Sequence, residues 1–239
     1  MPVEGGAPGH AAAYSPGRPS PAHRRATHHQ HPSAPSPPHD KLPNPPHHLG
    51  ENCWTPAQTV IVLNGPGSVG KSSVARALQA IAVRPFLHVA LDRFLAMVPP
   101  ALFGRAEGLV FEPVEDAGRP CLAVRTGPVV ARALAGMRHA VAAMAGQGND
   151  LIVDEVMIGE AKDQAYRALL PACEVRFVGL FAPLEVLEAR ERARGDREIG
   201  LARWQHRRVH EGVTYDLTLE TSRATPEDCA RAIRDAFAL

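Results

Sequence analysis

The sequence predicts an α/β fold in which helices cover both faces of a five-stranded parallel sheet. Short, continuous apolar runs recur along the chain, and stretches with helical periodicity separate them. Strands buried on both faces, as in parallel sheets, consist of such runs. The first run leads into a glycine-rich loop, and two later runs end in acidic residues. Right-handed crossovers bring the loops after parallel strands to one edge of the sheet, so these polar residues are expected to lie together.

The predicted elements follow in a regular order after residue 56. Strands are predicted at residues 59–63, 86–91, 151–153, 174–180 and 215–219. Helices are predicted at residues 72–82, 128–146, 160–170, most of 184–211, and from Pro226 onward. Two apolar runs, 109–111 and 121–124, flank the turn signal 115–118, which predicts a small hairpin insertion at 108–126.

Composition separates residues 1–55 from residues 56–239. The first fifty-odd residues hold 12 of the 23 prolines and 8 of the 12 histidines, and they show no apolar periodicity. Such a segment cannot bury enough apolar surface to offset the entropy of ordering it, so a disordered tail is predicted. The folded domain is therefore expected to span residues 56–239.

Charge and cysteine content exclude several classes of function. Residues 1–50 hold four basic and two acidic groups, which leaves 22 basic and 23 acidic groups for the rest of the chain. A near-neutral domain argues against a nucleic-acid partner. The four cysteines lie about fifty residues apart without a CxxC pair, as in a cytoplasmic protein with reduced thiols. Neither an apolar run of about 18 residues nor a signal peptide is present, so no membrane partner is expected.

The glycine-rich loop matches the phosphate-binding pattern GxxxxGK[ST] at every fixed position. The loop would wrap ATP with its backbone N–H groups, and the helix that follows would add its positive end. Lys71 would reach the β- and γ-phosphates, and Ser72 would ligate Mg²⁺. Lysine is rare here, with 3 against 23 arginines, yet one occupies the position that favours a compact charge. The residues predicted to bind ATP are Gly65, Pro66, Gly67, Ser68, Val69, Gly70, Lys71, Ser72 and Ser73.

The remaining sequence narrows the class of phosphate-binding protein. No NKxD element for reading guanine is present, and the chain is too short for the accessory domains of most motor ATPases. A small phosphoryl-transfer enzyme remains. The predicted fold is therefore P-loop kinase-like, a three-layer α/β/α domain with a small hairpin insertion and a helical lid.

Two carboxylates follow predicted strands at the ligand-binding edge. Asp92 is a candidate general base that would accept the proton of an attacking hydroxyl, or alternatively an N-cap of a helix that begins at Arg93. Asp154 is a candidate for the Mg²⁺ shell, with a solvated strand-end carboxylate as the alternative. Glu155 is a weaker candidate beside it.

Three arginines recur at helical spacing in the predicted lid. Arg190, Arg194 and Arg197 lie at i, i+4 and i+7, which would place them on one helical face. Arginines on a closing segment would neutralise charge on the transferred phosphoryl group. A solvated face with i,i+4 ion pairs is the alternative.

Several of these segments together resemble the chloramphenicol phosphotransferases, which use ATP to phosphorylate the drug's primary hydroxyl. The resemblance covers about residues 58–239. The segments that carry it are 64–73, 91–92, 152–156, RARGDR at 192–197, and VHEGVTYD at 209–216. Pro66 departs from the family, which has a small residue there.

This resemblance implies roles for particular residues. Asp92 would be the catalytic base, residues 190–210 would form the lid, and Thr221 and Ser222 would lie on the nucleotide side. The apolar segment 94–98 would line the acceptor pocket, with Phe94, Met97, Val98 and Glu155 as the expected contacts to the acceptor. An ordinary amphipathic helix is the alternative for residues 94–98.

Three hypotheses for function follow. The first is a kinase that inactivates chloramphenicol or a similar hydroxylated antibiotic. The second keeps the chemistry but takes a metabolite, a sugar or a nucleotide sugar as the acceptor. The third is a nucleotide-binding regulator that transfers no phosphate.

Overall fold

A computed structural model describes residues 57–159, 162–195 and 198–239 of the chain. The predicted tail at residues 1–55 and the candidate lid residue Arg197 lie outside the described residues.

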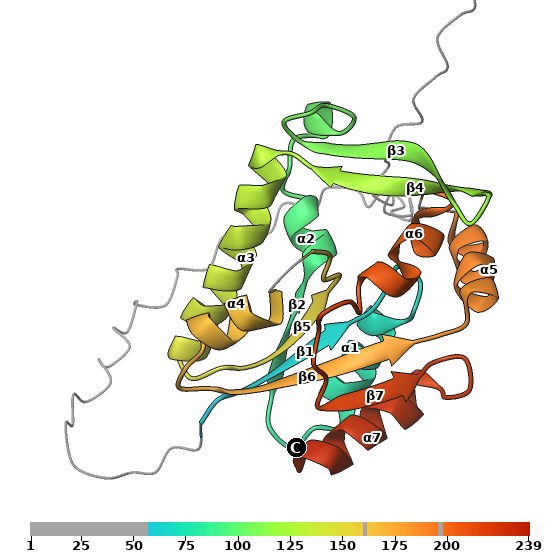
Figure 1. Ribbon diagram of the computed structural model, residues 1–239. Coiled ribbons are helices and arrows are strands. Elements are labelled where there is room, and N and C mark those ends of the chain that lie inside the picture. The colour runs from blue at the N-terminus through green and yellow to red at the C-terminus, as the bar shows by residue number, and fades with distance from the viewer. Residues whose placement is uncertain (1–56, 160–161, 196–197) are drawn as a thin grey trace, which may run out of the picture. The chain divides into compact units, whose positions relative to one another are not determined.

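The core of the fold is a five-stranded sheet with strand order β2-β5-β1-β6-β7, in which all neighbouring strands pair in parallel (Figure 1). The predicted fold class is therefore confirmed. The strands are β1 (Thr59–Asn64), β2 (Phe86–Ala90), β5 (Asp150–Glu155), β6 (Glu174–Phe181) and β7 (Leu217–Glu220). Strand β7 begins two residues later than the sequence pattern predicts.

Helices cover both faces of the sheet because successive strand side chains point to opposite sides. In β1, Ile61 and Leu63 join the apolar cluster beneath α1 and α7, whereas Val60 and Val62 join the cluster beneath α3 and α4. The helices of the first layer are α1 (Lys71–Ile81) and α7 (Pro226–Phe237), and those of the second are α3 (Pro128–Gly146) and α4 (Lys162–Leu169). Every residue of β1 is buried, as its continuous apolar run predicts.

A two-stranded hairpin covers part of the carboxyl edge of the sheet (Figure 1). Its strands are β3 (Leu109–Asp116) and β4 (Arg119–Thr126), preceded by the short helix α2 (Leu91–Leu95) and the 3₁₀ turn η1 (Pro100–Leu102). The two turn residues, Ala117 and Gly118, have φ values of 52° and 71°. Positive φ at both positions is the geometry that matches the twist of a two-residue hairpin. A third apolar cluster, around Val98 and Val130, lies beneath the hairpin.

The predicted lid consists of two helices, α5 (Leu184–Arg194) and α6 (Leu201–Arg208). Helix α5 ends where Gly195 adopts a left-handed conformation with φ of 66°. Gly200, with φ of 96°, starts α6, and its carbonyl accepts a hydrogen bond from the N–H of Leu122 on β4 at 3.3 Å. The side chains of Arg208 and Asp116 lie 3.2 Å apart at the hairpin tip. The hairpin and α6 are therefore bound to each other.

The VHEGVTYD segment ties the end of α6 to the start of the phosphate loop. The amide of Asn64, at the end of β1, donates to the carbonyl of Val209 and to the hydroxyl of Tyr215, each at 2.6 Å. The Tyr215 hydroxyl lies 2.7 Å from Nδ1 of His210, whose ring stacks on Phe181 at 3.9 Å between centroids. Burial, together with the nearby His206 and Lys71 charges, lowers the pKa of His210 to about 4. The ring is therefore neutral at pH 7, and its Nδ1 accepts the Tyr215 proton.

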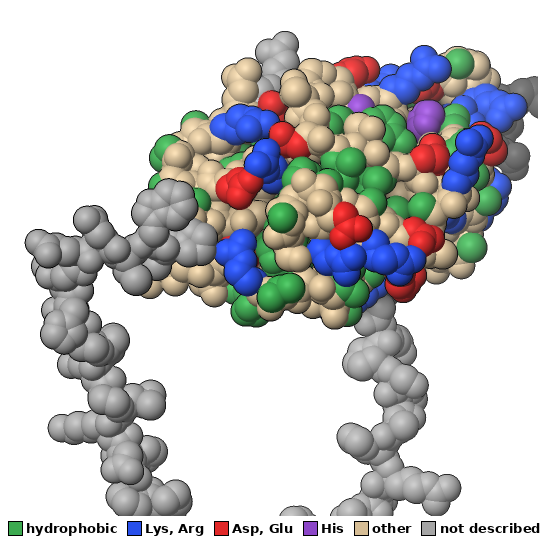
Figure 2. Space-filling view, turned by 90° about the horizontal axis from the view of Figure 1, so that it is seen from below, with side chains coloured by type: hydrophobic (Ala, Val, Ile, Leu, Met, Phe, Trp, Pro, Cys, Tyr) green, Lys and Arg blue, Asp and Glu red, His purple; other side chains and the backbone are tan. Residues whose placement is uncertain are grey.

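The face seen in Figure 2 mixes basic and acidic side chains and shows no continuous basic patch. Within the described part of the chain, no helix has both the length and the apolar character needed to cross a membrane.

The buried His210 predicts a loss of stability in mild acid. The unfolded ring titrates near 6.5 and the folded ring near 4, so stability is complete above pH 6.5 and falls as the pH is lowered toward 4. Urea unfolding of the wild type should therefore lose more free energy over this range than unfolding of His210→Gln. Because the ring is only partly buried, solvent screening limits the expected difference to roughly 1–2 kcal/mol. Parallel curves for the two proteins would contradict this account.

Candidate active site

The phosphate loop lies between β1 and α1 at the carboxyl edge of the sheet. Gly70 has a φ of 103°, a left-handed conformation that L side chains rarely adopt. Gly65 approaches β6 so closely that a β-carbon would lie 2.7 Å from the carbonyl oxygen of Leu180. The two glycines are therefore required for different reasons, one for conformation and the other for space.

Lys71 and Asp154 form the charged centre of the loop. The Lys71 ammonium donates to the carbonyls of Gly65 and Pro66 at 2.9 and 3.1 Å, and it lies 3.8 Å from an Asp154 oxygen. The Ser72 hydroxyl donates to Asp154 at 2.5 Å. Burial by itself would raise the pKa of Asp154, but the Lys71 charge, the hydrogen bond from Ser72 and the nearby His88 ring outweigh it, and the pKa is lowered. Asp154 is therefore an anion at neutral pH.

The groups around the loop fit a nucleoside triphosphate and a hydrated Mg²⁺. The hydroxyl of Ser68 is buried without a hydrogen-bond partner, and it borders a polar cavity of about 330 Å³, which we call the phosphate cavity. The described residues contain no cluster of three or more metal-binding side chains. One carboxylate, Asp154, and one hydroxyl, Ser72, match the way Mg²⁺ is held mostly by phosphates and water. The side chains that line this cavity are Ser68, Lys71, Ser72, Ser73, Arg76, Leu91, Asp92, Asp154, Val156 and Arg194, together with Gly70.

A second cavity opens on the other side of the loop, between α5 and α7. It is lined by Val69, Ser73, Arg190 and Thr221, among others. The Arg190 guanidinium donates to the Thr221 carbonyl at 2.8 Å and to its hydroxyl at 3.1 Å. Arg190 therefore borders this second cavity, and its role in phosphoryl transfer stays a prediction.

Ser222 differs from expectation. Its hydroxyl donates to Glu220 at 2.7 Å, and it does not line the cavity beside Thr221. Arg194, another of the predicted lid arginines, borders both this cavity and the phosphate cavity.

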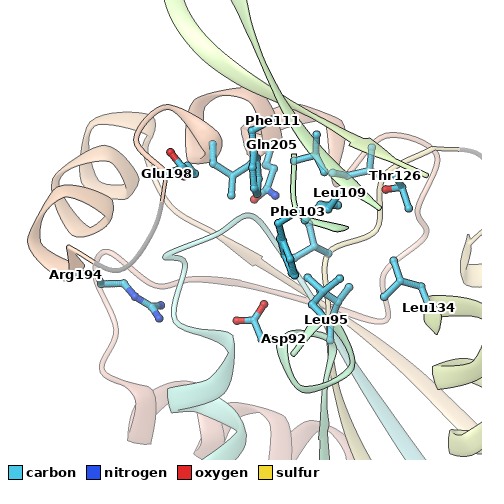
Figure 3. Close-up of a pocket in the computed structure, with 15 residues that line it drawn as sticks. Asp92, Leu95, Phe103, Leu109, Phe111, Thr126, Leu134, Arg194, Glu198 and Gln205 are labelled. Atoms are coloured by element: carbon cyan, nitrogen blue, oxygen red, sulfur yellow. The ribbon is translucent and has the colours of Figure 1, made fainter. Parts of the chain in front are cut away.

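A third cavity, of about 230 Å³ and mainly apolar, lies between the hairpin, α2, α3 and α6 (Figure 3). We refer to it as the acceptor cavity. It meets the phosphate cavity at Asp92, whose carboxylate points into the space between Arg194 and the apolar side chains (Figure 3). Asp92 lies within α2, which starts at Leu91, so it is not an N-cap. The lining residues are Leu91, Asp92, Leu95, Phe103, Leu109, Phe111, Val124, Thr126, Leu134, Val156, Ile158, Arg194, Glu198, Leu201 and Gln205.

Only part of the segment 94–98, which the resemblance places in the acceptor pocket, borders this cavity. Leu95 lines the cavity, whereas Phe94 packs toward the α3 and α4 layer. Met97 is 66% exposed, and Val98 is buried in the cluster beneath the hairpin. Helix α2 begins at Leu91 and is only five residues long, so packing against α3 sets which side chain faces the cavity.

Glu155 is likewise not an acceptor contact. It is 3% exposed, its carboxylate accepts a hydrogen bond from the Tyr166 hydroxyl at 3.0 Å, and Arg138 lies 3.9 Å away. A buried carboxylate with such partners holds α4 and α3 to the end of β5.

Sequence reasoning missed three polar residues at the site. Arg76 borders the phosphate cavity, and its position four residues after Ser72 on α1 could have revealed it. Glu191 is 1% exposed and accepts the N–H groups of Gly200 and Ala202 at 2.8 and 2.7 Å, so it caps α6 from α5. Gln205 lies between the phosphate loop and the acceptor cavity. No local signal marks Glu191 or Gln205.

The fold, the phosphate loop and the adjoining acceptor cavity define a P-loop kinase that acts on small molecules. The chain belongs to the family described as chloramphenicol phosphotransferase-like protein, which it matches over residues 58–238. The resemblance predicted from the sequence is thus confirmed, and ATP is the phosphoryl donor of such kinases.

Known relatives agree with this assignment. The chain is 30% identical over 188 residues to Rv2636 of Mycobacterium tuberculosis (strain ATCC 25618 / H37Rv), a proposed O-phosphotransferase by name. That similarity covers 76% of this chain and 83% of the relative.

Two solved structures share the fold. APS kinase CysC of Mycobacterium tuberculosis, in complex with AMPPNP and APS, has a TM-score of 0.54 at 18% identity and covers 77% of this chain and 99% of its own. The tunicamycin resistance protein of Deinococcus radiodurans has a TM-score of 0.53 at 18% identity, with coverage of 76% and 96%.

The position of the Lys71 ammonium in the phosphate loop predicts that replacing Lys71 weakens nucleotide binding strongly. Removing one charged hydrogen-bond donor should weaken binding of AMPPNP with Mg²⁺ by about 10- to 100-fold in Lys71→Ala. Isothermal titration calorimetry measures the change, with Arg231→Ala on the exposed face of α7 as the control. Unchanged affinity in Lys71→Ala would contradict the assignment of the loop.

Because the buried Glu191 side chain caps α6, we expect the substitution Glu191→Gln to weaken the attachment of α6 to α5 in the lid. One N–H of α6 would then face an amide N–H, at an expected cost of about 1–3 kcal/mol. Hydrogen exchange at Gly200 and Ala202 should accelerate, and urea unfolding should report the lost stability. Glu185→Gln, an exposed change on the same helix, should alter stability by less than about 0.5 kcal/mol. Equal protection of the two amides in both variants would refute the cap.

Proposed function

We propose that the chain transfers the γ-phosphoryl group of ATP, with Mg²⁺, to a hydroxyl of a small and largely apolar molecule such as chloramphenicol. One observation carries the proposal: Asp92 borders both the phosphate cavity and the acceptor cavity. A carboxylate at this junction is within the space where an alcohol from one cavity would meet a phosphate from the other. Inactivation of a hydroxylated antibiotic follows from such a reaction.

Each charged group has a distinct role in the proposed reaction. Asp92 accepts the proton of the hydroxyl as its oxygen attacks, which is worth roughly 10²–10⁴ in rate. Lys71 and Arg194 supply positive charge beside the transferred group, where it stabilises the transition state. Ser72 and Asp154 would hold the metal ion, which neutralises charge on the phosphates. ATP supplies the phosphoryl group, and ADP leaves with the bridging oxygen.

The lining of the acceptor cavity favours an apolar acceptor over a sugar. Its walls are mostly leucine, valine and phenylalanine side chains, and polar groups occur mainly at its edges, in Asp92, Arg194, Glu198, Thr126 and Gln205. A sugar needs a hydrogen-bond partner for most of its hydroxyls, since an unpaired polar group costs free energy on burial. An aromatic or branched molecule with few polar groups fits such walls better.

A panel assay tests this function. Purified protein is incubated with Mg-ATP and chloramphenicol, other hydroxylated antibiotics, sugars and nucleotide sugars, and mass spectrometry detects an added phosphate. We expect phosphorylation of chloramphenicol or a similar apolar alcohol, and at least about 100-fold slower turnover in Asp92→Asn. Asp235→Asn, on the exposed end of α7, is the matched control.

Other outcomes of the panel discriminate between the hypotheses. Preferential phosphorylation of a sugar or nucleotide sugar would favour the metabolite kinase. Tight binding of ATP without transfer to any acceptor would favour a regulator, as would full activity of Asp92→Asn.

A further inference from the structure

Gln205 connects the phosphate loop to the acceptor cavity. It lies on α6, is 6% exposed, and its Oε1 accepts a hydrogen bond from the backbone N–H of Gly67 at 2.7 Å. The same side chain lines the acceptor cavity, and Figure 3 shows its carboxamide among the apolar side chains there.

The orientation of this carboxamide follows from chemistry. A backbone N–H can only donate, so the atom that faces Gly67 must be the oxygen of Gln205. The NH₂ group is then the free end. Within the described chain, no protein group accepts a hydrogen bond from this Nε2, and it is not among the fully buried unpaired atoms. It is therefore a fixed donor that opens on the acceptor cavity.

We propose that Gln205 is a specificity-determining residue that donates a hydrogen bond from Nε2 to an oxygen of the acceptor. This inference rests on the proposed function and extends it. Among the other polar groups of the cavity, the carboxylates of Asp92 and Glu198 only accept, Arg194 also borders the phosphate cavity, and Thr126 carries a hydroxyl that can donate as well as accept but belongs to an exposed residue. The acceptor therefore carries, besides the reacting hydroxyl, a carbonyl, nitro, ether or hydroxyl oxygen that meets Gln205.

The hydrogen bond between the Gln205 carboxamide and Gly67 also determines how a bound acceptor is aligned with the phosphate loop. Because Oε1 is held by the phosphate loop, an acceptor bound to Nε2 is positioned relative to the loop itself. A molecule without the oxygen would leave Nε2 desolvated and unpaired, which disfavours its binding. Gln205 thus selects molecules by the placement of one polar atom in a mainly apolar cavity.

Two variants separate this role from simple support of the loop. Gln205→Glu has nearly the same shape and still accepts the Gly67 N–H, but it has no donor for the acceptor. Gln205→Met loses both interactions. Gln164→Glu, at an exposed position on α4, is the matched control. Steady-state kinetics are measured for each protein with Mg-ATP and chloramphenicol, or with the panel compound that the wild type phosphorylates best.

We expect KM for the acceptor to rise about tenfold in both Gln205 variants, and more than KM for ATP. The control should keep the wild-type values. Circular dichroism checks folding, and if Gln205→Met does not fold, Gln205→Glu decides, because it keeps the bond to Gly67.

Two results would overturn the inference while leaving the proposed function intact. The first is a Gln205→Glu enzyme that uses the acceptor as well as the wild type. The second is an equal rise in KM for ATP and for the acceptor in both variants, which would make Gln205 only a support of the loop. Absence of transfer by the wild type to every compound would instead remove the proposed function, and this inference with it.

Discussion

The close packing of the phosphate loop against β6 is the constraint on which the site depends. At Gly65 there is no room for a β-carbon beside the Leu180 carbonyl and the Val69 side chain. The loop is therefore held deep against the sheet, where Lys71 meets Asp154 at the end of the neighbouring β5. A bulkier residue would displace the loop from β6, and with it the charged centre.

A second set of contacts holds the phosphate loop to α6 and to the segment that follows α6. Asn64 binds the segment after α6, and Gln205 on α6 binds Gly67. Glu191 fastens the start of the same helix to α5. Helix α6 is also bonded to the hairpin, which forms much of the acceptor cavity. The walls of that cavity and the phosphate loop are consequently parts of one hydrogen-bonded assembly, so that the position of an acceptor and that of a phosphate are linked.

The family-specific segment at residues 209–216 contributes hydrogen bonds that support the site, not side chains that line a cavity. Its histidine and tyrosine lie in none of the three cavities described. They form a partly buried chain of hydrogen bonds from Asn64 through Tyr215 to His210, and Asp216 binds the backbone of Phe177 through both its carboxylate and its N–H. The segment therefore positions the phosphate loop, and its side chains need not contact a ligand to matter for the reaction.

The sequence by itself determined the parallel sheet, the hairpin, the phosphate loop and the placement of Asp92 and Asp154 at one edge. Apolar runs and the loop pattern are local properties, and chain handedness brings the strand ends together. Only the tertiary structure decided which residue of the segment 94–98 faces the acceptor cavity, that Arg190 binds Thr221, and that Gln205 reaches Gly67. Those outcomes depend on the packing of a short helix and on contacts between residues more than thirty positions apart, which no local pattern encodes.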